Sequence, residues 1–230
     1  MKNIAIIPAR GGSKRIPFKN IKAFLGKPIL AYSIETALQS NLFQEVMVST
    51  DDEQIAEIAL QYGAKVPFLR SDKTANDYAG IADVIIEVLE AYQKRHMRFD
   101  ALCCLLATAP LIQADDLKNT YKILQTTEYT SICPIVAFSY PVLRSLTLNK
   151  EKRLERCWPE FADTRSQDME TFYHDAGAFY WSTQEAFLRY KRFISPNCGA
   201  YIMDELKVND IDNETDWKLA ELKYKLIHNC

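Results

Sequence analysis

A loop near the start of the chain contains the residue types that bind phosphate groups. Residues 8–20 read PARGGSKRIPFKN and follow a short apolar run. Two adjacent glycines let backbone N–H groups turn toward an anion, and cations and a hydroxyl can donate hydrogen bonds to phosphate oxygens. We expect a phosphate cradle formed by Arg10, Gly11, Gly12, Ser13, Lys14, Arg15 and Lys19. The spacing is not that of a Walker loop, because Ser13 separates Gly12 from Lys14, and a solvated basic turn is the alternative.

A cluster of acids lies near the other end of the chain. Residues 204–216 contain six Asp or Glu residues and a single base, Lys207. We expect a strand over 206–211, which places Asp210 and Asp212 on one face and Ile211 in the core. Two neighbouring carboxylates favour a bound cation, and oxygen ligands with room for phosphate and water suit Mg²⁺. The alternative is helix capping, by Asp212 itself or by a capping box of Asn213 and Asp216.

The charges are segregated along the chain although the net charge is only −2. Residues 2–34 contain seven bases and no acid. If this segment meets residues 204–216 in the folded protein, anion-binding and metal-binding groups share one site. A polyphosphate chelated to a metal ion requires that arrangement. Convergence of Lys14 and Asp212 on one ligand is therefore the central expectation.

A third polar cluster lies at residues 164–168 (TRSQD) and 172–180 (FYHDAGAFY). His174 and Asp175 raise the question of a catalytic dyad. No Ser or Cys nucleophile is recognisable with them, and adjacent residues rarely align as base and orienting group. A polar substrate pocket is the better interpretation, in which Arg165 binds an acid through a bidentate contact.

The hydrophobic periodicity predicts the elements that position these residues. Short apolar runs alternate with longer helical patterns, which is typical of an α/β fold with a parallel sheet and helices on both faces. We expect strands at 2–7, 46–49, 65–69, 101–106, 130–138, 177–181 and 206–211, with 101–106 in the centre. We expect helices from Pro28, after Thr50-Asp51, and at 81–92, 115–124, 184–190 and 214–227.

Residues 139–174 break this rhythm. They contain two prolines, short alternating pieces and no long helical pattern, which indicates a β-rich insertion. The rest of the chain, 1–138 and 175–230, then forms the α/β core. Because so small a piece buries little surface by itself, we expect it to pack on the core or on a second subunit.

The composition excludes several classes of protein. With 230 residues, 48% hydrophobic residues and 28 bases against 30 acids, the chain is neither disordered nor collagen-like, and it does not coat nucleic acid. Its longest apolar run, 101–106, is far shorter than the roughly 20 residues of a membrane span. No secretory signal is recognisable, so we expect the cytoplasm. Six cysteines without C-x-x-C spacing indicate reduced thiols rather than a zinc site or disulfides.

These motifs together resemble the acylneuraminate cytidylyltransferases, which activate nine-carbon sugar acids as CMP derivatives. The likeness spans essentially the whole chain: residues 7–17 with Lys19-Asn20, residues 105–111 (LLATAPL), and Asp210-Ile211-Asp212 with Asp216 and Ala220-Glu221. Within the family, residues 164–168 and 173–177 are most similar to the pseudaminic acid enzymes. The sialic acid enzymes tend to have Pro-Asn-Gly where this chain has residues 174–177, HDAG.

The resemblance implies a fold, ligands and site residues. The fold is a mostly parallel, Rossmann-like sheet of the nucleotide-diphospho-sugar transferase type, and residues 139–174 reach across a homodimer toward the partner's active site. The residues implied to bind CTP are Ala9, Arg10, Gly11, Gly12, Ser13, Lys14, Lys19 and Asn20, with Arg70 and Asn76 near the cytosine or ribose. Mg²⁺ would be bound by Asp210 and Asp212. The residues implied to border the sugar-acid pocket are Arg165, Gln167, Tyr173, His174 and Asp175.

The implied reaction is attack of the anomeric hydroxyl on the α-phosphorus of CTP, with loss of pyrophosphate. The groups implied to be catalytic are Arg10, Lys14 and Asp212, and the general base is open between Asp212 and a metal-bound hydroxide. Pseudaminic acid is the expected substrate. Legionaminic acid, N-acetylneuraminate and Kdo are the alternatives, and a catalytically silent nucleotide-binding regulator or a dimeric interaction protein are alternatives of other classes.

Overall fold

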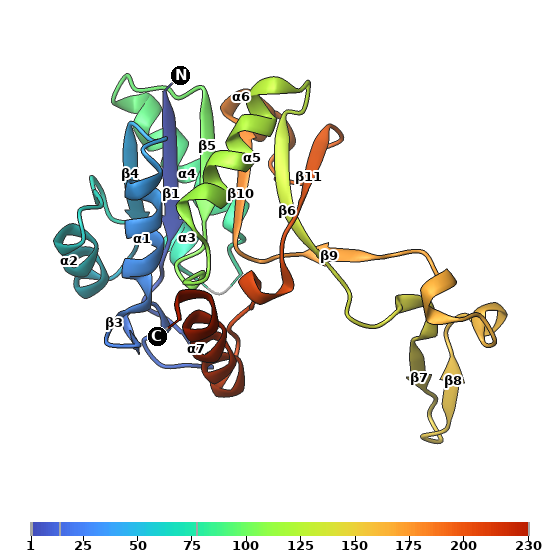
Figure 1. The fold of residues 1–230 in the computed structure, drawn as a ribbon. Helices are drawn as coiled ribbons and strands as arrows, with labels where there is room; N and C mark the ends of the chain where they lie inside the picture. Colours follow the sequence, from blue (N-terminus) through green and yellow to red (C-terminus); the bar gives the residue numbers. More distant parts are fainter. Residues whose placement is uncertain (1, 14, 77, 230) are drawn as a thin grey trace.

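The computed structural model describes residues 2–13, 15–76 and 78–229, and its centre is a seven-stranded sheet (Figure 1). The strands are β1 (Asn3–Pro8), β4 (Glu45–Ser49), β5 (Ala101–Leu105), β6 (Ser131–Ala137), β9 (Tyr173–Asp175), β10 (Phe179–Thr183) and β11 (Cys198–Ile202). The strand order is β11-β6-β10-β5-β1-β4, with β9 paired to β6. All strands except β9 and β10 run in one direction. The predicted α/β class and mostly parallel sheet are confirmed.

Helices cover both faces of the sheet. They are α1 (Ile29–Ser40), α2 (Glu53–Gln61), α3 (Asp72–Ala75), α4 (Ile81–Lys94), α5 (Ala114–Thr126), α6 (Gln184–Tyr190) and α7 (Glu214–His228). Side chains of β1 alternate between two cores, as expected for a strand buried on both faces. Ala5 lies in one cluster with Leu30 of α1 and Leu117 of α5. Ile4 lies in the other cluster with Ile85 of α4.

A smaller third cluster lies beside the loop that follows β1. That loop continues into the 3-10 helix η1 (Lys19–Ile21) and the short paired strands β2 (Ala23–Phe24) and β3 (Lys27–Pro28). Phe24 is fully buried, and its ring packs edge-on against Tyr32 and Trp217. Since Trp217 belongs to α7, this cluster joins the first residues of the fold to its last helix.

Several expected elements differ from the observed ones. The expected strand at 65–69 makes one bridge, Met47 with Lys65, and α2 is capped by Asp52 rather than by residues 50–51. The expected strand at 206–211 is wrong. The chain there forms a 3-10 helix, η5 (Glu205–Lys207), because the Asp204 side chain caps it by accepting from Leu206 N. The strand at this edge of the sheet is instead β11, whose small residues give a weak strand signal in the sequence. One of them, Gly199, is required by packing, because a Cβ there would lie 2.4 Å from the Tyr129 ring.

Residues 139–172 form an extension that lies away from the body of the molecule (Figure 1). It contains η2 (Val142–Arg144), η3 (Pro159–Phe161), η4 (Ser166–Asp168) and the hairpin of β7 (Leu146–Leu148) and β8 (Leu154–Arg156). None of residues 138–175 is buried. Leu148 and Leu154 are 62% and 69% exposed. The extension therefore has no apolar core of its own within one chain.

Two further expectations concern the chain as a whole. No helix in the described part of the chain combines the length and apolar character of a membrane span. Cys103, Cys104, Cys133, Cys157 and Cys198 are free thiols in this structure. Cys230 lies outside the described residues.

Candidate active site

A cavity of about 590 Å³ opens at the carboxyl ends of β1 and β5. The residues that line it are Pro8, Arg10, Ser13, Arg15, Ile16, Lys19, Asn20, Arg70, Ala79, Ile81, Val84, Leu106, Ala107 and Thr108. In open α/β sheets, ligands bind outside the carboxyl ends of the strands. The expected phosphate cradle therefore lies where the fold supplies a ligand site.

Hydrogen bonds fix the shape of the loop after β1. Ala9, which is buried, donates its N–H to Ser49 O at 2.9 Å, and Gly11 N–H donates to the Asp51 carboxylate at 3.1 Å. Asn20 Nδ2 donates to Arg10 O at 2.9 Å. A Cβ on Gly11 would lie 2.7 Å from Asp52 Oδ2, whereas one on Gly12 would meet nothing within 4 Å. Gly11 is needed for packing, and Gly12 faces open space in which a ligand can approach the backbone.

The basic loop and the acidic segment meet beside this cavity. Lys19 Nζ donates to Ile211 O at 2.7 Å, and Arg15 forms an ion pair with Asp212 at 2.6 Å. Ile16 and Ile211 are both buried in the third cluster. The described cations therefore converge with the carboxylates as the segregation of charge suggested. Lys14, on which the central expectation depends, lies outside the described residues.

The acids near the start of α7 have different partners: Asp216 takes part in capping the helix, whereas Asp212 does not. Asn213 caps α7 by accepting from Thr215 N and Asp216 N, and Asp216 Oδ2 accepts from Asn213 N. Asn213 and Asp216 therefore form the capping box of α7, which was one of the two capping arrangements predicted from the sequence. Asp212 is not the cap: its backbone N–H donates to Asp216, and its side chain turns to Arg15.

Asp210 and Asp212 interact as two like charges at close range. Burial and the neighbouring Asp212 carboxylate raise the pKa of Asp210, against the effect of Lys19. Burial lowers the pKa of Lys19, and this effect outweighs the two carboxylates, which would raise it. Asp210 also lies beside Gly177, where a Cβ would be 3.8 Å from Asp210 Cβ. Gly177 has a positive φ of 60°, a backbone conformation that favours glycine at this position.

The donor set fits a hard cation that completes its coordination with other ligands. In residues 2–13, 15–76 and 78–229, no three His, Cys, Asp or Glu side chains are grouped to hold a metal. Two carboxylates that repel each other, next to a cavity for phosphate, are the partial oxygen set that Mg²⁺ takes with phosphate and water. Arg15 balances the charge of Asp212 in this structure.

Arg70 precedes the short helix α3, and Asn76 is the residue that ends it. Arg70 is buried, lines the cavity and donates to Ser49 Oγ at 3.2 Å. Burial lowers its pKa. The Asn76 side chain is engaged locally: its Nδ2 donates to Lys73 O, and its Oδ1 accepts from Tyr78 N and Ala79 N. The backbone carbonyl of Asn76, rather than its side-chain amide, accepts a hydrogen bond from the Arg10 guanidinium at 3.5 Å.

The residues expected around a sugar acid are divided between the body and the extension. Arg165 pairs with Asp168 at 3.1 Å within the extension, next to Gln167. Tyr173, His174 and Asp175 form β9 at the sheet, and the His174 ring packs on Phe138. Asp175 accepts from Gly177 N and Tyr180 Oη, both at 2.7 Å. Asp175 thus holds the Gly177 turn beside Asp210, while Arg165 and Gln167 do not join the site within one chain.

Two residues that support the site, Ser49 and Asp51, were not predicted from the sequence. Ser49 accepts from Arg70 and Ala9, and Asp51 accepts from Gly11. Ser49 is the last residue of β4 and Asp51 follows that strand closely. Polar residues at the carboxyl end of a parallel strand are the sequence signal that could have identified them.

Comparison with known proteins identifies the family. The cytidylyltransferase family model matches residues 4–204. The chain belongs to this cytidylyltransferase family. A Campylobacter jejuni (serotype O:2) relative named pseudaminic acid cytidylyltransferase is 43% identical, over 99% of this chain and 98% of its own. A Legionella pneumophila relative named CMP-N,N'-diacetyllegionaminic acid synthase is 32% identical, over 96% and 95%.

A solved structure supports the fold of this cytidylyltransferase. CMP:2-keto-3-deoxy-manno-octonic acid synthetase, complexed with CTP, has a TM-score of 0.71 at 19% identity and covers 100% of both chains. The sequence-based resemblance to a family of cytidylyltransferases, and with it the assignment as a nucleotidyltransferase, is confirmed.

Proposed function

We propose that this enzyme transfers the CMP moiety of CTP to pseudaminic acid and releases pyrophosphate, with Mg²⁺ at Asp210 and Asp212. The observation that carries the proposal is the meeting of the basic loop with residues 210–212 beside the cavity. The identity of 43% to a relative named for pseudaminic acid, against 32% to one named for a legionaminic acid, supports this choice of acid.

The positions of the described residues support the following proposed roles, and the role of Lys14 is proposed from its place in the loop sequence. Arg10, Ser13 and Lys19 line the cavity and bind the triphosphate, with Lys14 of the same loop. Gly11 and Gly12 bring the backbone close to phosphate, while Ala9 and Asn20 hold the loop through hydrogen bonds. Arg70 and the Asn76 loop form the nucleoside end of the site. Asp210 and Asp212 hold the ion, which when bound supplies Lewis-acid stabilisation of phosphate charge.

The reaction is a displacement at phosphorus. The anomeric oxygen bonds to the α-phosphorus, the bond from that phosphorus to the bridging oxygen of pyrophosphate breaks, and the hydroxyl proton is released to solvent. Such transfers depend on positioning and charge stabilisation rather than on covalent catalysis by the protein. Arg10 and Lys14 therefore act by balancing charge on the phosphate oxygens.

The enzyme is proposed to work as a cytoplasmic homodimer, with residues 139–174 as its dimerisation unit. No residue of 138–175 is buried in the single chain, and exposed leucines line β7 and β8. Apolar side chains so exposed are typical of an interface. A second subunit would cover them and bring Arg165 and Gln167 to a sugar-acid pocket bordered by Tyr173, His174 and Asp175.

The substrate is tested by turnover. The protein is incubated with CTP, Mg²⁺ and one acid at a time: pseudaminic, legionaminic, N-acetylneuraminic and Kdo. We expect pyrophosphate release to be fastest with pseudaminic acid. Turnover with only another acid would contradict the choice of substrate but not the reaction. Light scattering after size exclusion measures the oligomeric state, and a monomer would contradict the dimer.

A further inference from the structure

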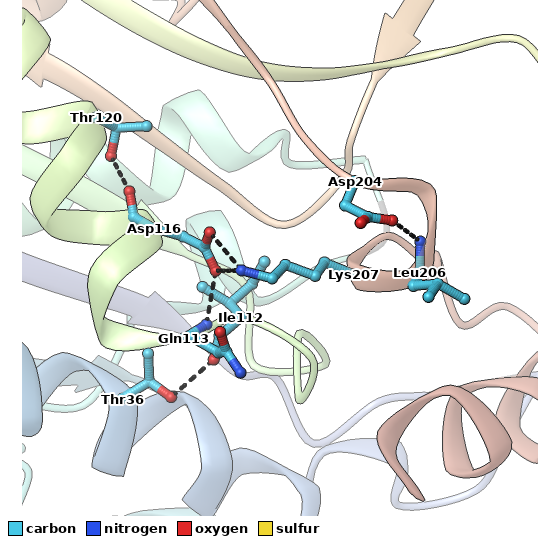
Figure 2. A network of polar contacts seen from close by, with 8 residues as sticks. All are labelled: Thr36, Ile112, Gln113, Asp116, Thr120, Asp204, Leu206 and Lys207. Atoms are coloured by element: carbon cyan, nitrogen blue, oxygen red, sulfur yellow. Dashed lines mark hydrogen bonds and ion pairs between the residues drawn. The ribbon is translucent and has the colours of Figure 1, made fainter. Parts of the chain in front are cut away.

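A partly buried ion pair joins the acidic segment to helix α5. Lys207 Nζ lies 3.0 and 3.2 Å from the two carboxylate oxygens of Asp116 (Figure 2). The Asp116 side chain is 5% exposed and that of Lys207 26% exposed. Lys207 is the single base among residues 204–216, and it lies three residues before Asp210.

Asp116 is a fixed anchor point for this lysine. It belongs to the first turn of α5, where its Oδ2 accepts from Gln113 N at 3.0 Å in a capping box. The Asp116 carbonyl accepts from Thr120 Oγ1, and Thr36 of α1 donates to the carbonyl of Ile112 (Figure 2). The carboxylate therefore has a defined position relative to two core helices.

The segment held by Lys207 makes other contacts before it reaches Asp210: Val208 is buried in the first core cluster, and Asn209 Nδ2 donates to Asp216 O at 3.1 Å. On one side, Met203 N donates to Ile135 O at 2.8 Å, which continues the pairing of β11 with β6. On the other, Lys223 Nζ of α7 donates to the carbonyls of Glu205 and Val208, at 2.9 and 2.7 Å. These ties run to the sheet and to α7, whereas the Lys207 ion pair runs to α5.

We infer that Lys207, through Asp116, is a positioning residue that sets where residues 208–212 present Asp210 and Asp212 to the bound ion. This inference rests on the proposed role of these two aspartates in holding Mg²⁺. Charge burial stabilises folded proteins little on balance, because desolvation offsets the attraction. The consequence of this pair is therefore geometric: it limits how far the acidic segment can move from the cavity.

The test compares two lysines that pair with aspartates of the same helix. Lys207→Met removes the partly buried ion pair with Asp116. Lys118→Met removes the exposed pair of Lys118 with Asp115, 3.1 Å apart on α5. Two quantities are measured: the Mg²⁺ concentration for half-maximal pyrophosphate release, and hydrogen–deuterium exchange of the amides of Asp212 and Asn213 in the ligand-free protein. Both amides donate to Asp216.

We expect Lys207→Met to raise the half-maximal Mg²⁺ concentration about tenfold, the lower end of the effect of removing groups that orient metal ligands. The two amides should exchange faster. Lys118→Met should change neither quantity, and Lys207→Arg should restore both. If Lys207→Met fails to fold because Asp116 is left unpaired, Lys207→Met with Asp116→Asn removes both charges and should show the same two changes.

The outcomes separate the inference from the proposed function. No turnover by the wild-type protein with any acid contradicts the function. Given an active wild type, a Lys207→Met enzyme with the Mg²⁺ requirement of the Lys118→Met enzyme overturns the inference. A change in only one of the two quantities also overturns it, because the effect would then not pass through residues 208–213.

Discussion

The loop site at the end of the sheet and the extension of residues 139–172 are held in opposite ways. At the site, Ile16 and Ile211 are buried in one cluster, and two cations reach across to residues 211 and 212. In the extension, the hairpin is paired in register, but no side chain is buried. One chain is therefore sufficient to bring the basic loop and the acidic segment together, whereas the extension obtains a core only from another surface.

The first prediction tests the role of Asp212 in the contact between the basic loop and the acidic segment. Asp212→Ala should reduce turnover about 100- to 1,000-fold, the size of effect seen when a group that stabilises transition-state charge is removed. Folding should change little, because the ion pair with Arg15 is exposed and such pairs stabilise by about 1 kcal/mol or less. Single-turnover kinetics and urea unfolding measure the two effects. Asp115→Ala, which breaks an exposed pair on α5, is the control; a near-normal rate for Asp212→Ala would contradict the role of Asp212.

The second prediction contrasts two leucines. Leu105 of β5 is fully buried and Leu154 of β8 is 69% exposed. Leu105→Ala should destabilise the monomer fold by about 2–5 kcal/mol through the cavity it leaves. Leu154→Ser should change unfolding of the body by less than about 0.5 kcal/mol. Its effect should instead be weaker association, measured by sedimentation over a range of protein concentrations. Unchanged association would remove Leu154 from the proposed interface.

The same contrast explains which features could be predicted from sequence. The convergence of the basic loop with Asp212 was predictable, because opposite charges segregated to two segments are most stable together. The strand predicted over 206–211 is wrong, although the predicted direction of the side chains is right. Residues 208–212 do not form a strand, yet Ile211 is buried between Asp210 and Asp212 as alternation in an extended segment requires. Local periodicity thus indicated which side chains point inward, but not whether a neighbouring strand pairs with them.

Features set by tertiary neighbours were not predictable. The apolar run at 177–181 indicates a strand, but its antiparallel direction depends on where the extension returns the chain to the sheet. The engagement of the Asn76 side chain by its own loop depends on the turn that residues 76–79 adopt. Arg165 and Gln167 lie on the exposed extension, and their proposed place beside a substrate requires the proposed second subunit. None of these is encoded in the periodicity of the chain.

The third prediction concerns the two adjacent glycines of the loop. Gly11→Ala places a Cβ 2.7 Å from Asp52 Oδ2, so the cap of α2 must shift, and we expect destabilisation of about 1–3 kcal/mol. Gly12→Ala meets nothing within 4 Å and should leave stability within about 0.5 kcal/mol of wild type. Because Gly12 faces the open space in which we propose that phosphate binds, its variant should still reduce the rise in melting temperature that CTP with Mg²⁺ produces. An unchanged rise for Gly12→Ala would place phosphate elsewhere on the loop.

The fourth prediction is a dependence of stability on pH that arises in the body. Glu87 of α4 accepts from Ser71 N at 2.8 Å, from Ser71 Oγ at 3.0 Å and from Thr74 Oγ1, and so holds α3 against α4. Burial alone would raise the pKa of Glu87. The hydrogen bonds from Thr74 and Ser71, and the nearby Arg70 guanidinium, outweigh it, so that the pKa is lowered.

The sign of the effect follows from this lowered pKa. The folded protein holds the ionised carboxylate more strongly than the unfolded chain does. The stabilisation is therefore complete above the ordinary pKa of Glu, about 4.3, and is lost as the pH falls through the lower folded value. Glu87→Gln should cost about 1 kcal/mol at pH 7, and the difference from wild type should shrink toward pH 3. Urea unfolding across this range measures it, with Glu90→Gln on the exposed part of α4 as the charge-matched control. A difference that is constant from pH 7 to pH 3 would mean that Glu87 holds α3 by packing rather than by its charge.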